Sequence, residues 1–258
     1  METPMARLPA LVEALAEVDL RSHATLNHIA RLVRDAGEIT STKRGAGGAK
    51  MEYRDAATLL MAACGDINPL GAVAAAKRMQ ALEPIPADAV RAMQREDLPA
   101  HFDWLREPTS FATTLTRLIE HAPQLETWEA AYQAGGAEGV GGGASEAEFS
   151  VTRAISRFAQ GGFQPGLSKP VRVIFYAPGI AAEIHLGWVW DDLTEADAFH
   201  EYYAAPQAAG QVEGPHEPAP DVMFPVEIGV RTLLALHHAV NQKPRTRGPA
   251  KNPRKPNT

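Results

Sequence analysis

The stretch that decides the predicted fold runs from Ala24 to Leu60 and reads ATLNHIARLVRDAGEITSTKRGAGGAKMEYRDAATLL. Its first part places apolar side chains three and four positions apart, at Leu26, Ile29, Leu32, Val33 and Ala36. This spacing predicts an amphipathic helix that opens near Ser22 and ends at Gly37. The residues that follow the helix, 38–50, are polar and rich in glycine, so they cannot pack a core of their own.

Cationic side chains are frequent on the polar side of this helix and in the loop that follows it. The candidate contact residues are His28, Arg31, Arg34, Lys43, Arg44 and Lys50. On the helix, such side chains can contact phosphates and base edges. In the loop, glycines allow close approach of the backbone to a sugar-phosphate chain, and the three cations would neutralise phosphate charge.

The segment IARLVRDAGEITSTKRGAGGAKMEYRDAATLL resembles winged-helix regulators, in which the second helix of a helix-turn-helix precedes a strand-turn-strand wing carrying Lys, Arg and Gly. The resemblance covers roughly residues 8 to 64 and implies that the six candidate residues contact double-stranded DNA. The chain also has a general resemblance to uncharacterised phage- and prophage-type proteins. Two other interpretations stay open: a solvated helix with a flexible polar loop, and a helix that already starts within 51–55. A phosphate-binding P-loop is excluded, because no strand precedes the glycines and Met51 follows the lysine.

Composition indicates an intracellular protein with a substantial core. The chain has 258 residues, of which 45% are hydrophobic. Its single cysteine, Cys64, excludes an intrachain disulfide and a Cys-rich zinc site, which favours the reducing cytoplasm. No stretch approaches the roughly 18 apolar residues of a membrane-spanning helix, so no membrane is expected among the partners.

The net charge of −6 is distributed unevenly along the chain. Residues 1–64 carry eight Lys and Arg against eight Asp and Glu, whereas residues 65–150 carry six against thirteen. Residues 151–242 carry five against ten, and residues 243–258 carry six against none. An acidic body discourages non-specific adhesion to DNA and would confine contact to the basic elements.

The predicted fold is mostly α with a C-terminal α+β part. Its units are a winged-helix-like DNA-binding domain (1–65), a helical packing or dimerisation region (66–134), a Gly-rich linker (135–147), a small α+β domain (148–242) and a disordered basic tail (243–258). The helical region contains four apolar-periodic segments, 70–82, 87–96, 110–121 and 124–133, separated at prolines.

Within the C-terminal part, the pattern predicts a helix over 145–159, a β-hairpin over 170–190, a short helix containing Phe199, Tyr202 and Tyr203, an edge strand over 222–228, and a final helix over 230–241. The aromatic group Trp188, Trp190, Tyr202 and Tyr203 is expected to fill the core of this domain. Pro225 favours the edge position for its strand, since proline cannot donate to a neighbouring strand.

Catalytic and metal-binding patterns are weak. Glu183 and His185 alternate on a predicted strand and so share one sheet face. We interpret them as a polar, solvent-facing side; as an enzyme site, His185 would transfer a proton and Glu183 would orient it. No histidine pair has metal-ligand spacing, and we expect no enzyme activity, no metal and no cofactor.

The leading functional hypothesis is therefore a cytoplasmic, sequence-specific DNA-binding protein, a phage- or prophage-type transcriptional regulator that acts as a homo-dimer or higher homo-oligomer. Two alternatives stay open. One is a small terminase-like recognition subunit for DNA packaging, and the other is an interaction protein that modulates a host complex, with its C-terminal domain contacting a protein partner.

Overall fold

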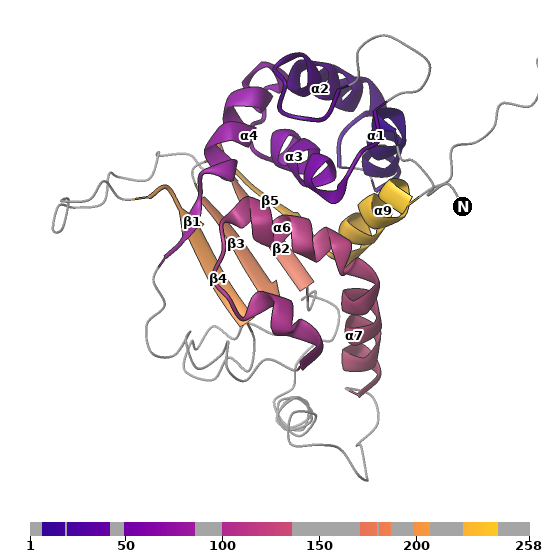
Figure 1. Ribbon diagram of the computed structural model, residues 1–258, viewed down its shortest axis with the longest axis vertical. Coiled ribbons are helices and arrows are strands. Elements are labelled where there is room, and N and C mark those ends of the chain that lie inside the picture. Colours follow the sequence, from indigo (N-terminus) through magenta and orange to yellow (C-terminus); the bar gives the residue numbers. More distant parts are fainter. Residues whose placement is uncertain are drawn as a thin grey trace, which may run out of the picture.

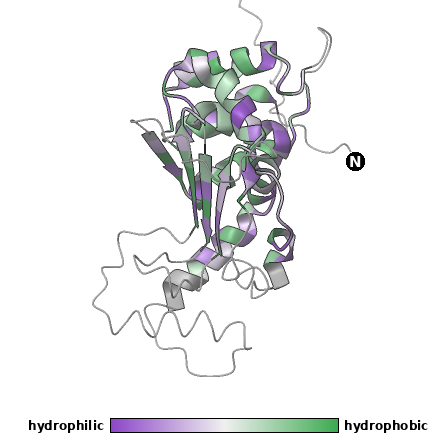
Figure 2. Cartoon of the chain, turned by 90° about the vertical axis from the view of Figure 1, so that its left-hand side faces the viewer, coloured by the Kyte–Doolittle hydropathy of each residue, from purple (hydrophilic) through white to green (hydrophobic). Residues whose placement is uncertain are grey.

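A layer of helices covers one face of an antiparallel sheet in the part of the chain that the structure describes (Figure 1). The structure is a computed structural model that describes residues 7–18, 20–41, 49–85, 100–135, 171–179, 181–186, 199–206 and 224–241. Viewed from the side, the strands stand together and the helices lie next to them and above them (Figure 2). The expected mixture of helices with an antiparallel sheet is confirmed.

Two amphipathic helices begin the described chain. Helix α1 spans Leu8–Glu17 with a proline in its first turn, a position where the missing N–H costs little. Helix α2 spans His23–Asp35; the Ser22 hydroxyl caps it by accepting from the backbone N–H of Thr25 at 3.2 Å. After α2, Gly37 adopts a φ of +77°, a left-handed conformation that favours glycine. Short, capped helices of this kind depend on packing their apolar faces.

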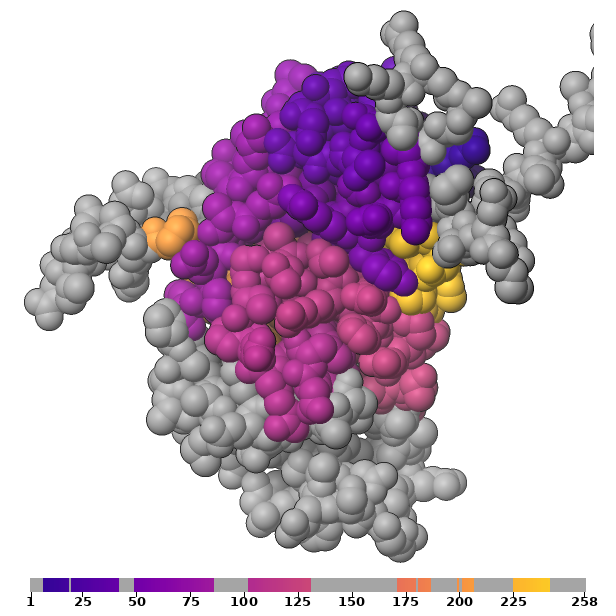
Figure 3. Space-filling view, viewed as in Figure 1, coloured from indigo at the N-terminus to yellow at the C-terminus, as the bar shows by residue number. Residues whose placement is uncertain are grey.

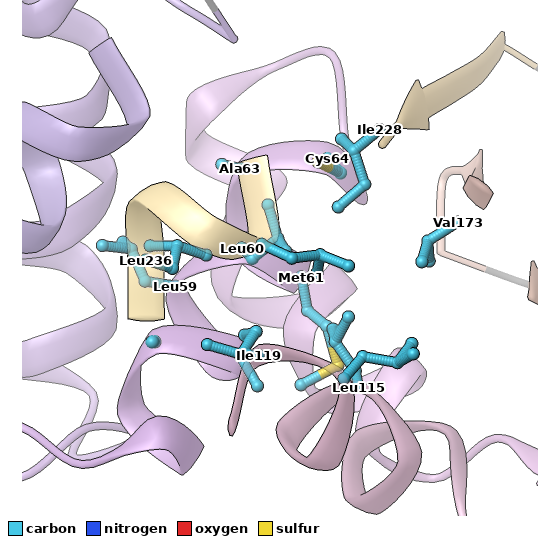
Figure 4. Close-up of a cluster of buried hydrophobic side chains, with 14 of the residues drawn as sticks. Leu59, Leu60, Met61, Ala63, Cys64, Leu115, Ile119, Val173, Ile228 and Leu236 are labelled. Carbon is cyan, nitrogen blue, oxygen red and sulfur yellow. The ribbon is translucent and has the colours of Figure 1, made fainter. Parts of the chain in front are cut away.

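Helix α3, Tyr53–Cys64, is surrounded by protein on every side. All its residues from Asp55 to Cys64 are buried, with alanine at four positions. These small side chains allow close approach of α2, α4 (Ala72–Gln80), α6 (Phe111–Glu120) and α9 (Val230–Asn241). Figure 4 shows Leu60 and Met61 in the same buried cluster as Leu115 of α6 and Val173 of the sheet. A helix that is apolar all round must be buried in this way.

The sheet has five strands in the order β1-β4-β3-β2-β5, and every neighbouring pair is antiparallel. The strands are β1 (Glu83–Pro84), β2 (Val171–Ala177), β3 (Ala181–Leu186), β4 (Phe199–Ala204) and β5 (Phe224–Ile228). Strict alternation of burial along β2 places Val171, Val173 and Phe175 against the helices. The two-residue β1 comes from the N-terminal half of the chain and pairs with β4, so the sheet combines distant segments.

The remaining described elements join the helices to this sheet. They are two 3-10 helices, Pro69–Gly71 and Ala100–Leu105, and helix α7, Ala122–Gly135. Helix α9 contacts α1, α3, α6 and α7, and one continuous cluster of buried apolar side chains runs from Leu11 to Val240. The predicted unit boundary at 65/66 thus falls between α3 and α4, two helices that pack together.

Several elements agree with the sequence-based expectations. The helices α2, α4, α6, α7 and α9 lie where periodicity predicts them, and the hairpin of β2 and β3 turns at Pro178 and Gly179. Strand β5, which contains Pro225, lies at an edge. The predicted helix 87–96, the helix 145–159, Trp188, Trp190 and the tail 243–258 lie outside the described residues, as does most of the linker 135–147.

Two expectations are wrong in detail. The segment Phe199–Ala204 is a strand, because its alternating side chains pair with β3, and only Tyr203, Glu201 and Phe199 face the helices. The apolar face of α2 is narrower than expected: Leu32 is half-buried and Ala36 is exposed. The expected wing stays a prediction: residues 39–41 and 49–52 form no strand, and residues 42–48 lie outside the described residues.

Removal of a buried side chain from α3 should destabilise the whole fold. Leu60 is fully buried, so Leu60→Ala should lower the free energy of unfolding by about 2–5 kcal/mol, from lost apolar burial and a residual cavity. The matched control is Leu70→Ala, because Leu70 is 71% exposed. Urea denaturation of both variants tests this; equal stabilities would contradict the central position of α3.

Cys64 should make stability sensitive to alkaline pH. Burial raises the pKa of its thiol from 9.0 to about 12, with Arg21 acting weakly in the opposite direction. The raised pKa means that the thiol contributes stability below pH 9, which is lost as pH rises towards 12. Urea denaturation at about pH 8 and about pH 10.5 should show a smaller pH-dependent loss for Cys64→Ala than for the wild type. An identical loss in both proteins would refute the effect.

Candidate nucleic-acid interface

The structure places the six predicted contact residues in three groups. Arg31 and Arg34 are exposed on α2 and line one cavity together. His28 is exposed on α2 but does not line that cavity, and Lys50 is exposed beside an adjoining one. Lys43 and Arg44 lie outside the described residues. The sequence pattern was therefore right about exposure on α2 but could not say which of these cations converge.

The cavity at α2 has a volume of about 380 Å³ and is built from three segments. Helix α2 contributes Asn27, Ala30, Arg31 and Arg34, which recur on one helix face. The start of α1 contributes Arg7, Leu8, Pro9 and Val12. The two ends of the loop contribute Thr40, Ser41, Ala49 and Met51. We call this the α2 cavity; among the described residues, its lining contains three arginines and no carboxylate.

Arg7 is a residue that sequence reasoning missed. It stands at the N-cap of α1, where its side chain makes no cap hydrogen bond, and it is exposed. No periodicity could have singled it out, because its place beside α2 depends on how α1 packs against α2. In the part of the chain that the structure describes, neither Arg7 nor Arg31 takes part in an ion pair.

Arg34 has one acidic neighbour. Its guanidinium donates to Asp35 Oδ1 from Nε at 3.0 Å and from Nη2 at 2.8 Å. The side chains of the pair are 44% and 68% exposed, so solvent screens the attraction. Such a pair contributes about 0–1 kcal/mol, which a phosphate could replace by a bidentate, charge-assisted contact.

The buried carboxylate of Asp55 fixes the loop end that forms one wall of the α2 cavity. It accepts hydrogen bonds from the backbone N–H of Thr40 at 2.8 Å, from the Thr40 hydroxyl at 3.0 Å, and from the backbone N–H of Glu52 at 2.9 Å. The Glu52 side chain reciprocally caps the start of α3. The loop thus leaves and re-enters the core at positions held by one carboxylate.

The far face of the sheet contains a second polar cluster, and here the solvent-facing interpretation is wrong. His185 is only 4% exposed, and its Nε2 lies 2.8 Å from Glu183 Oε2. The Tyr176 hydroxyl donates to the other oxygen of Glu183 at 2.7 Å. Burial raises the pKa of Tyr176, and the hydrogen bond to Glu183 raises it further. Burial and the Glu183 charge also raise the pKa of Tyr202.

The cluster joins Tyr176 of β2 to Glu183 and His185 of β3. The antiparallel pairing of the two strands brings these side chains together. None of its residues lines any of the four cavities described for this part of the chain. Within the same residues, no group of three or more His, Cys, Asp or Glu side chains could hold a metal ion. Nor does any described helix have the length and apolar character needed to cross a membrane.

Comparisons with known proteins give no further guidance: no family model, no curated protein and no solved structure matches this chain. Its function must therefore be inferred from the geometry and charge of its own surface.

Tyrosine titration should reveal the Glu183 cluster. Since the pKa of Tyr176 and of Tyr202 is raised, both should ionise above the ordinary range near pH 10 in the folded protein. Glu183→Gln removes the negative charge and should move the absorbance titration at about 295 nm to lower pH. Glu227→Gln, an exposed change on the same sheet face, is the control and should leave the curve in place. A curve insensitive to Glu183 would contradict the cluster.

Proposed function

We propose that this chain is a DNA-binding protein that contacts a duplex through the exposed face of α2 and the α2 cavity. The observation that carries the proposal is the convergence of Arg7, Arg31 and Arg34 on one cavity whose described lining residues include no carboxylate. In a chain with a net charge of −6, three arginines at one site mark a surface suited to anions. Arginine also matches phosphate geometry bidentately.

The shape of α2 supports the same conclusion. Its buried side, Leu26, Ile29, Ala30 and Val33, holds the helix on the core, while its polar side stays exposed over the whole length. A helix presented in this way can enter a major groove, with His28 and Arg31 near base edges and Arg34 near phosphates. Lys50 and the cations of the loop, Lys43 and Arg44, would contact the backbone or the minor groove.

A regulator of phage or prophage type, working in the cytoplasm as a dimer, is the form of this function that we favour. Regulators that read two-fold symmetric sites are commonly dimers, whereas DNA-packaging recognition subunits assemble into rings. The mass of the particle in solution and the symmetry of the selected DNA sequence distinguish these two roles.

The test is binding of the full chain to a pool of random duplexes at two salt concentrations, with sequencing of the bound fraction. We expect an enriched motif and salt-sensitive binding. Arg31→Ala and Arg34→Ala should each weaken binding about tenfold and relax the motif, while Lys43→Ala with Arg44→Ala should weaken binding to all sequences. Arg7→Ala should lower the salt slope by about 0.9.

Arg231→Ala is the matched control, because Arg231 is an exposed arginine on α9 that lines none of the cavities described here. It should bind as the wild type does. If all the α2 and loop variants bind like this control, or if the wild type retains no duplex at either salt concentration, DNA binding at α2 is wrong. Copurification with a host protein complex would then favour the interaction-protein alternative.

A further inference from the structure

Two further cavities lie near the α2 cavity, beside α3 and α6. A second cavity, of about 350 Å³, shares Met51 with the α2 cavity and is lined by residues 50–54, Thr116, Val240 and Asn241. A third, of about 630 Å³, shares Arg54 and Thr116 with the second. The second and third cavities together are named the α3–α6 groove. The two helices that form it pack against each other and lie one above the other in the view of Figure 3.

The floor and the walls of the α3–α6 groove differ in chemistry. The deepest lining residues are Ala57, Thr58 and Met61 of α3, which are only 1–2% exposed, so a ligand would contact the walls above them. The walls carry hydroxyl and amide groups from Gln80, Ser110, Thr113, Thr116 and Asn241. The axial rise of α3 from Arg54 to Met61 is about 10 Å. A groove of this length can run beside more than one phosphate of an extended nucleic-acid chain.

Positive charge dominates the lining. Lys50 and Arg54 are exposed, and neither takes part in an ion pair in the described part of the chain. Arg117 is half-buried and donates from Nη1 to the backbone oxygen of Trp104 at 2.8 Å. Among the described residues that line the groove, Glu52 is the one carboxylate, and it accepts the hydrogen bond that caps α3. The groove therefore offers three cations to a ligand and little competing negative charge.

We propose that the α3–α6 groove binds a single-stranded segment of nucleic acid, as an extension of the duplex interface at α2. A single phosphodiester chain can follow the exposed walls of the groove, with phosphates at Lys50, Arg54 and Arg117 and with sugars or bases at the hydroxyl-lined wall. This inference rests on the proposed function, because it takes its ligand chemistry from the adjoining arginines of the α2 cavity.

Binding of the full chain to a fluorescent oligothymidylate, followed by anisotropy at several salt concentrations, tests the groove. Arg54→Ala should weaken binding severalfold and lower the salt slope by about 0.7, the value for one phosphate contact on a single strand. Thr113→Trp should weaken it without changing charge, because an indole at this exposed position obstructs the groove. Circular dichroism and thermal melting show that both variants fold. Arg231→Ala is the charge control and should bind normally.

The same variants separate this inference from the proposed function. If duplex binding depends on Arg31 and Arg34 but Arg54→Ala and Thr113→Trp leave oligothymidylate binding unchanged, the groove inference is wrong and the duplex interface stands. If oligothymidylate binding depends on Arg54 while no duplex binds, the groove stands and the duplex interface is wrong. The groove inference is also wrong if the wild type does not bind oligothymidylate. It is wrong too if a polyglutamate peptide binds equally well and in an Arg54-dependent way, because the ligand would then be an acidic protein segment.

Discussion

The burial of α3 from Asp55 to Cys64 is the constraint on which the rest of this structure depends. A helix with apolar side chains on all sides cannot remain in water, so other elements must surround it. Here α2, α4, α6 and α9 do so, and the inner face of the sheet joins them through β2. Segments from both ends of the chain thus share one core. Substitutions that enlarge or shrink this helix must affect both halves of the molecule, because close-packed interiors transmit changes in volume.

The same helix positions the candidate interface. Asp55, near the N-terminus of α3, holds Thr40 and the backbone of Glu52, so both ends of the glycine-rich loop begin from fixed points. At the other end of α3, Arg21 donates to the carbonyl of Ile67 at 2.9 Å and so ties the entrance of α2 to the chain beyond α3. With α2 held at its start and the loop held at its ends, the arginines of the α2 cavity are presented by a rigid frame. Preorganisation of this kind reduces the entropy lost when a ligand is bound.

Most errors of the sequence-based interpretation come from the sheet. The segment Phe199–Ala204 has aromatic residues in a spacing that fits a helix, yet pairing with β3 on one side and β1 on the other makes it a strand. Tertiary hydrogen bonding overrides local preference in such short segments. Likewise, Glu183 and His185 alternate as polar strand residues do, but they hydrogen-bond to each other and Glu183 also accepts from Tyr176 of β2, while His185 is only 4% exposed. A pattern along one strand carries no information about the neighbour that covers it.

What the sequence determined by itself is local. The periodicity of apolar residues placed α2, α4, α6, α7 and α9, and turn chemistry at Pro178 and Gly179 placed the hairpin, because both signals arise within a few residues of each other. It also showed that His28, Arg31, Arg34 and Lys50 would be exposed. Only the tertiary structure decided that Arg7 stands beside Arg31 and Arg34, that β1 joins a sheet made from the C-terminal half, and that a cation-lined groove crosses α3 and α6. These features depend on contacts between residues far apart in the chain, which the packing of α3 establishes.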